Sequence, residues 1–122
     1  MPRPIVLYSE SRYPDDLVEK AVYGNDIELR WRDVDDVRDL DPADCADVEG
    51  LAVMRHGVTA EDFRKFPKLR CVLRMGVGYD KIDRKAAEAH NVMVCNVPDY
   101  GTTEVADHAM ALALSLRRGV LL

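Results

Sequence analysis

The 122-residue chain has the length of one ordinary domain, which is enough to bury a hydrophobic core but short for a two-domain enzyme. Its formal net charge is −5, and basic residues are interspersed with acidic ones, so nucleic acid is not expected as a partner. No run approaches the roughly 18 apolar residues that a membrane span needs, and the start lacks the apolar region of a signal peptide. We therefore expect a cytoplasmic protein without membrane contact.

Cysteine and histidine spacing gives no indication of a metal site. Cys45, Cys71 and Cys95 are odd in number and lie far apart without Cys-x-x-Cys spacing, so neither a disulfide framework nor a zinc site is expected. His90 and His108 have no other ligand types clustered near them in the sequence. No metal is therefore predicted.

The first half of the chain alternates between strand and helix patterns. Residues 5–8 form a short apolar run typical of a buried strand, and residues 14–23 have a helical pattern. Residues 27–31 alternate apolar and charged side chains, the period of two expected of a strand at a sheet edge. A short helix is predicted from Asp41, because proline follows this capping residue, and residues 50–54 are predicted to form a fully buried strand.

The second half continues the alternation. Thr59 and Asp62 predict a capping box for a helix over 60–66, and residues 71–75 are predicted to form the fourth strand. A helix over 84–90, capped by Asp83, leads to a fifth strand over 92–95. A long helix runs from Thr102 or Thr103 to Arg118, and its apolar or small side chains on all sides indicate complete burial.

Five alternations of strand and helix predict an α/β protein, a flavodoxin-like doubly wound domain with a parallel five-stranded sheet covered on both faces. The Pro/Gly-containing loop at 96–101 is the one boundary that the pattern shows. The helix after it ends in the apolar tail Val120-Leu121-Leu122, for which the chain offers no partner, so we expect the sequence to be part of a longer one.

A glycine pair marks the most informative loop. Gly76-Val77-Gly78 follows the hydrophobic run 70–75 directly, so the backbone can turn sharply and bring amide N–H groups close to a small anion. Taken alone, the spacing favours an ordinary strand-to-helix turn. It is not a dinucleotide fingerprint, because the third glycine of Gly-x-Gly-x-x-Gly is absent.

The segments "RMGVGYDKID", "NVP" and "VADHAMALALSLRR" occur in this order along the chain. Together they resemble the N-terminal portion of the D-isomer-specific 2-hydroxyacid dehydrogenase family, in particular the C-terminal-binding-protein branch, which includes transcriptional corepressors. The resemblance implies a substrate-binding domain over 1–100 and the truncated start of a Rossmann NAD-binding domain over 101–122. It also implies an oxidoreductase that uses NAD or NADP and moves a hydride between a 2-hydroxy acid and the nicotinamide.

The resemblance also assigns roles to individual residues. The amides of Val77 and Gly78 would hold the substrate carboxylate, with His56 orienting the substrate and Arg55 as a less secure contact. Arg74 corresponds to a substrate-contacting arginine, although a structural ion pair is an equal alternative. Val105 matches the position that packs against the nicotinamide.

By the same resemblance, no catalytic residue lies in this segment, because the family's catalytic Arg, Glu and His would follow Leu122. The helix over 105–118 corresponds to a homodimer interface. Two functions stay open: an enzyme acting on a small 2-hydroxy or 2-keto acid, and a corepressor-like homologue that binds proteins in an NAD(H)-sensitive way. The absence of an interaction tail before the first strand favours the enzyme slightly.

Overall fold

The computed structural model describes residues 2–10 and 15–120, and within these residues the strands form one parallel sheet. Its order is β2-β1-β3-β4-β5, which confirms the predicted flavodoxin-like α/β fold. The strands are Ile5–Tyr8 (β1), Glu28–Trp31 (β2), Val48–Val53 (β3), Cys71–Arg74 (β4) and Met93–Asn96 (β5). All carboxyl ends of the strands therefore meet at one edge of the sheet.

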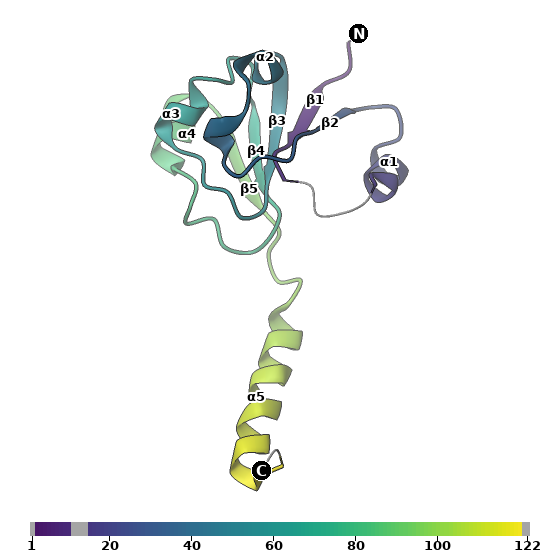
Figure 1. Cartoon of the computed structure of the whole chain (residues 1–122), viewed down its shortest axis with the longest axis vertical. Helices are drawn as coiled ribbons and strands as arrows, with labels where there is room; N and C mark the ends of the chain where they lie inside the picture. The colour runs from purple at the N-terminus through teal and green to yellow at the C-terminus, as the bar shows by residue number, and fades with distance from the viewer. Residues whose placement is uncertain (1, 11–14, 121–122) are drawn as a thin grey trace.

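The helices lie between the strands along the chain, and a last one follows β5 (Figure 1). They are Leu17–Tyr23 (α1), Pro42–Cys45 (α2), Ala60–Phe63 (α3), Arg84–Ala89 (α4) and Thr102–Arg118 (α5), with a 3₁₀ turn at Val37–Asp39. The predicted caps are confirmed: Asp41 accepts from the Ala43 amide, Asp83 accepts from the Ala86 amide, and Thr59 and Asp62 form a capping box.

The hydrophobic core lies between the sheet and α2, α3 and α4. Leu51 and Val53 of β3 and Val72 of β4 are at most 1% exposed, and they pack with Phe63 and Phe66. The opposite face is less completely covered. α1 contributes no buried residue to it, and Met93 on β5 is 64% exposed. The expectation that both faces are covered is therefore met fully on one face only.

Several predicted boundaries differ from the structure. The helix predicted over 60–66 ends at Phe63, and Pro67 accounts for part of the difference because a residue before proline disfavours the helical conformation. The helix predicted over 84–90 ends at Ala89, with His90 as its C-cap. α1 begins at Leu17, and Pro14, where its pattern was predicted to open, lies outside the described residues.

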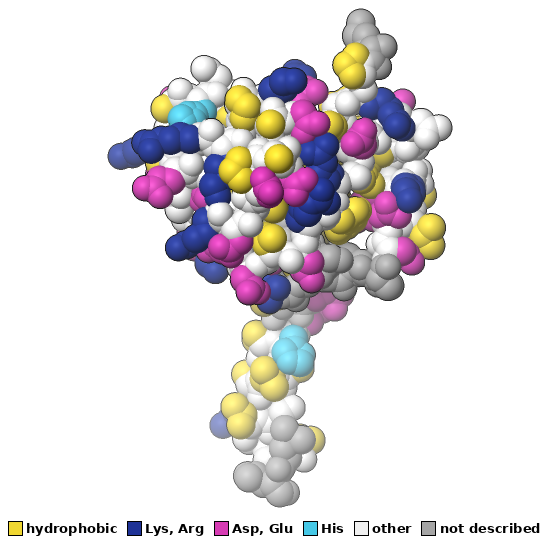
Figure 2. All heavy atoms as spheres, turned by 45° about the horizontal axis from the view of Figure 1, so that its top comes forward, with side chains coloured by type: hydrophobic (Ala, Val, Ile, Leu, Met, Phe, Trp, Pro, Cys, Tyr) yellow, Lys and Arg dark blue, Asp and Glu magenta, His cyan; other side chains and the backbone are white. Residues whose placement is uncertain are grey.

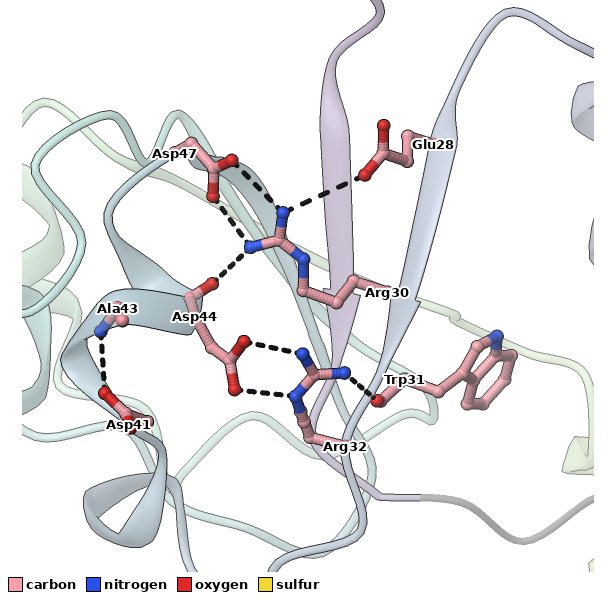
Figure 3. A network of polar contacts seen from close by, with 8 residues as sticks. All are labelled: Glu28, Arg30, Trp31, Arg32, Asp41, Ala43, Asp44 and Asp47. Carbon is pink, nitrogen blue, oxygen red and sulfur yellow. Dashed lines mark hydrogen bonds and ion pairs between the residues drawn. The ribbon is translucent and has the colours of Figure 1, made fainter.

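Two arginines, Arg30 in the edge strand β2 and Arg32 directly after it, bind acidic residues in and after α2 (Figure 3). Arg30 pairs with Asp47 at 2.7 and 3.1 Å, and Arg32 pairs with Asp44 at 2.6 and 2.5 Å. Both contacts are bidentate, with two nitrogens of the guanidinium group bound to two oxygens of the carboxylate, which fixes the orientation of each guanidinium group. Since these arginines alternate with Leu29 and Trp31, the strand has the predicted charged and apolar faces.

The last helix, α5, extends away from the sheet (Figure 1). None of its residues is buried, and apolar side chains are visible along its length in Figure 2. The exposed ones are Val105, Met110, Leu112, Leu114 and Leu116. The burial that the sequence predicts for this helix is therefore not provided by the sheet. No helix in the described part of the chain is long and apolar enough to cross a membrane.

Candidate functional site

Residues at the ends of two strands, β3 and β4, and in the loops after them enclose a small pocket of about 140 Å³ at the carboxyl edge of the sheet. Four of the predicted substrate-binding residues line it: Arg55, His56, Arg74 and Gly78. The loops after β3 and β4 are joined by a bridge between Val58 and Ile82, and by a 3.2 Å hydrogen bond from Lys81 Nζ to the Arg55 carbonyl. The fold thus brings together residues that lie more than twenty positions apart in the sequence.

The fifth predicted residue, Val77, lies on the other side of the glycine loop. It is 49% exposed and lines a neighbouring open pocket of about 850 Å³ together with Gly78 and the start of α4. The glycine loop, which lies between the two pockets, is held in place by hydrogen bonds from Asn96 and Val97. Asn96 Nδ2 donates to the Val77 carbonyl at 2.7 Å, and the Val97 amide donates to the Gly76 carbonyl at 3.0 Å.

The amides of Val77 and Gly78 donate no hydrogen bond to any other described residue. Because the carbonyls around them are held and the amides are not, two N–H donors stay available at an exposed turn. Consecutive free amides of this kind form a concave site for an anion. That these two amides hold a carboxylate stays a prediction.

Arg74 places a positive charge beside this loop. Its guanidinium occupies the space above Gly76: a Cβ atom added to this glycine would lie 1.4 Å from Arg74 Nη1. Within the described residues, the guanidinium makes no ion pair and no side-chain hydrogen bond. The alternative of a structural ion pair therefore finds no partner there, and the charge is free to meet a ligand.

Glu10, directly after β1, organises the β3 loop, and its side chain is only 1% exposed. Its Oε2 atom accepts from the amides of Met54 at 2.6 Å and Arg55 at 2.7 Å, and from that of His56 at 3.4 Å. Its Oε1 atom accepts from Arg55 Nε at 2.9 Å. One carboxylate thus satisfies three successive backbone donors and one side chain.

His56 lies between two polar residues of the segment that follows β1. Its Nδ1 atom is 3.1 Å from Ser9 Oγ, and its Nε2 atom is 3.8 Å from Glu10 Oε1. The side chain is 8% exposed. His56 is therefore held in one orientation at the wall of the pocket, as a substrate-orienting group would need.

Burial has the largest single influence on the Glu10 carboxyl and opposes its ionisation, but hydrogen bonds outweigh it. Those from the Arg55 and Met54 amides and the Arg55 side chain, with the nearby His56, lower the pKa of Glu10 from 4.5 to about 2. The Glu10 carboxyl, with its pKa lowered to about 2, is therefore ionised at neutral pH.

This pKa predicts an acid-dependent loss of stability. A carboxyl with a lowered folded-state pKa stabilises the fold above its unfolded value of 4.5, and this contribution is lost as the pH falls toward about 2. At about 1.4 kcal/mol for each unit of pKa difference, Glu10 alone should contribute about 3 kcal/mol to the fall in unfolding free energy between pH 5 and pH 2. Urea unfolding followed by circular dichroism should show a fall that is about 3 kcal/mol smaller in Glu10→Gln than in the wild type, and equal pH dependence in both would contradict the prediction.

Some features of the site were not predicted. The sequence places Ser9 and Glu10 at the end of a strand, where ligand-binding residues gather, but nothing in it indicates that Glu10 turns inward. Asn96 also holds the glycine loop without a sequence signal beyond its place at the end of β5. Val105 is 69% exposed on α5 and does not line the 140 Å³ pocket, so its contact with a cofactor stays a prediction.

A parallel five-stranded sheet with the order β2-β1-β3-β4-β5 defines a flavodoxin-like α/β domain. Comparison with known families makes the assignment specific: residues 5–119 match the catalytic domain of the D-isomer specific 2-hydroxyacid dehydrogenases. The chain belongs to this family.

Curated and solved relatives agree with this assignment. D-3-phosphoglycerate dehydrogenase of Mycobacterium tuberculosis (strain ATCC 25618 / H37Rv) is 36% identical over 121 residues, which is 98% of this chain and 22% of that protein. The NADPH-dependent glyoxylate/hydroxypyruvate reductase of Sinorhizobium meliloti, solved with NADP and malonate, is 34% identical with a TM-score of 0.73, over 93% of this chain and 34% of that one. D-lactate dehydrogenase of Aquifex aeolicus, solved with NAD and lactic acid, has a TM-score of 0.74 at 24% identity over 92% and 33% of the two chains, and supports the fold alone.

The chain thus spans about a fifth of the length of the curated relatives that it matches. The more specific expectation, a place in the corepressor-like branch, is not supported. The relatives found are a phosphoglycerate dehydrogenase and a glyoxylate/hydroxypyruvate reductase. The three segments that suggested that branch are too short to outweigh similarity over nearly the whole chain.

Proposed function

We propose that the chain is the substrate-binding portion of an NAD(P)-dependent D-2-hydroxyacid dehydrogenase and that it holds the carboxylate of a 2-hydroxy or 2-keto acid. The observation that carries the proposal is the pair of free amides at Val77 and Gly78 beside the unpaired guanidinium of Arg74. Two N–H donors and one delocalised cation match the two oxygens and the charge of a carboxylate.

In this proposal the chain's own residues bind and orient the acid. Arg74 neutralises the carboxylate, while Arg55 and His56 form the wall of the pocket on the β3 side. The nicotinamide, when bound, supplies or receives the hydride at the C2 carbon of the acid. Orientation matters because hydride transfer needs the two carbons close together and aligned.

The described residues do not provide a complete cofactor site. The only Gly-x-Gly pair is followed by Tyr79-Asp80-Lys81 and lies at the pocket, so it cannot serve as the pyrophosphate loop of a dinucleotide fold. We propose that residues 1–100 form the substrate-binding domain and that 101–122 begin the NAD-binding domain. Its phosphate-binding loop and the catalytic Arg, Glu and His would then be supplied by residues beyond Leu122.

The test is the turnover of the complete protein that carries this chain. NADH or NADPH oxidation, followed at 340 nm, should occur with at least one acid among glyoxylate, hydroxypyruvate, pyruvate and 3-phosphohydroxypyruvate. The matching aldehydes or ketones without a carboxylate should not react. Absence of turnover with all four acids and both cofactors would reject the proposed activity. The corepressor-like alternative gains no support from the relatives, and no observation in the structure favours it.

A further inference from the structure

Glu10 is the one buried charge at the site that the proposed substrate contacts leave unused. It is 3% exposed as a residue, it lies in the segment after β1 and not in the loops that carry the proposed substrate contacts, and its carboxylate faces the β3 loop. A carboxylate is costly to bury unless donors surround it. Here four donors do so, which shows that the arrangement is built and not incidental.

The two oxygens of Glu10 act on different parts of the loop. Oε2 binds the backbone amides of residues 54–56 and so fixes the path of the chain. Oε1 accepts a hydrogen bond from Arg55 Nε, and the side chain of Arg55 is 64% exposed. Held through Nε alone, Arg55 keeps its two terminal nitrogens free of any partner among the described residues.

This geometry removes the main disadvantage of an exposed arginine as a ligand. A long, solvated side chain loses much rotamer freedom when it binds an anion, and the loss weakens the complex. A guanidinium already held on one edge has lost part of that freedom before binding, and its terminal edge can still meet a carboxylate in parallel. Arg55 lines the same 140 Å³ pocket as Arg74, so a prearranged Arg55 would act on the same ligand.

We propose that Glu10 is a positioning residue for the substrate: by holding Arg55 through Nε, it keeps the arginine's terminal nitrogens ready for the 2-keto acid. The inference rests on the proposed function, because it assigns that acid to this pocket. It assigns Glu10 no direct contact with the substrate. The lowered pKa of its carboxyl agrees with a constant charge that holds Arg55 at all working pH values.

The Glu10→Gln variant separates the two oxygens. The glutamine carbonyl can still accept the loop amides, but its NH₂ group then faces Arg55 Nε and cannot accept from it. In the complete enzyme with glyoxylate as the probe, we expect KM to rise about tenfold, the loss of one charge-assisted hydrogen bond, while kcat stays within about threefold. A matched control is Glu49→Gln, which removes the partner of the exposed Arg70 at 3.4 Å and should change neither constant.

A double-mutant comparison tests whether Glu10 acts through Arg55. In an Arg55→Met background, Glu10→Gln should raise KM no further, because the group it positions is already absent. If Glu10→Gln does not fold, Arg55→Lys answers the same question, since lysine has no Nε donor and should bind glyoxylate as weakly as Arg55→Met. An unchanged KM in Glu10→Gln, an additive effect in the double variant, or an Arg55→Lys enzyme with wild-type KM would each overturn the inference.

The outcomes also separate this inference from the proposed function. A wild-type enzyme that reduces glyoxylate or another 2-keto acid, combined with any of these negative results, rejects the role of Glu10 only. A wild type that reduces none of the acids rejects the proposed function, and the role of Glu10 fails with it. Each variant should keep the wild-type circular dichroism spectrum at the assay temperature, which excludes loss of the fold as the cause. Glu10→Gln is expected to have a lower thermal unfolding midpoint than the wild type, because it loses the charge that the loop donors stabilise.

Discussion

Replacing Gly76 with alanine should raise KM for a 2-keto acid by about ten- to a hundredfold, the cost of losing a charge-assisted contact, in the complete enzyme. The added methyl group would lie 1.4 Å from Arg74 Nη1 and 2.6 Å from its Cζ, so the guanidinium has to leave its place. Because the displaced atoms belong to the end of a flexible side chain, the fold itself should be little affected. Steady-state kinetics, with circular dichroism to monitor folding, measures both.

Gly101→Ala is the matched control for this variant. A Cβ atom at Gly101 would be 4.0 Å from the nearest side chain, an ordinary contact, so the same chemical change should leave KM as it is. A Gly76→Ala enzyme that folds and keeps the wild-type KM would show that Arg74 does not bind the substrate from its present position. In that case the pocket's charge would have to come from Arg55 or Lys81.

The second large effect concerns association through α5. Its exposed apolar side chains leave hydrophobic surface in water, which favours any available partner at about 25 cal/mol per Å² buried. We expect the 122-residue chain to self-associate at micromolar concentration. Leu112→Glu should raise the dissociation constant by at least about a hundredfold, because the contact would bury an unpaired carboxylate. Sedimentation velocity over a range of concentrations measures the change.

Thr102→Glu provides the control for added charge. It places the same carboxylate in the first turn of α5, where an acid suits the helix dipole and no apolar contact is removed. This variant should associate like the wild type. A wild-type chain that sediments as a monomer at about 100 µM, a concentration at which even weak dimers form, would contradict the assignment of α5 as an interface.

Much of the fold could be predicted because local patterns and the sheet agree. Alternation of apolar and charged residues in β2 predicts an edge strand, and the structure places β2 at the edge. The caps at Asp41, Thr59 and Asp83 are local, since each binds an amide a few residues away. Such features depend on sequence neighbours alone and are therefore readable from the sequence.

The surface that covers the apolar side chains of α1 and α5 could not be predicted in the same way. An apolar helix surface indicates that something should cover it, but the pattern does not say what does. Val18 and Val22 of α1 are each 74% exposed, and Leu116 of α5 is 79% exposed, so the described chain covers neither helix. The sequence pattern predicts that a helix face is buried. Which surface buries it depends on tertiary or quaternary structure.

The candidate site shows the same division. The strand-end rule groups Arg55, His56, Arg74 and Gly78 at one edge, and the structure brings them around one pocket. The same rule places Glu10 at this edge, but it does not show that the side chain turns inward, because this depends on donors from a distant loop. The contacts between Glu10 and residues 54–56 join positions more than forty residues apart.

The most direct test of the account is a crystal structure of the complete protein with its nicotinamide cofactor and oxalate, an unreactive dicarboxylate that resembles a 2-keto acid. We predict one carboxylate within hydrogen-bond distance, about 3 Å, of the Val77 and Gly78 amide nitrogens, with the Arg74 guanidinium paired to it. Oxalate bound elsewhere, with these two amides still without a ligand, would contradict the claim that the glycine loop after β4 binds the substrate carboxylate.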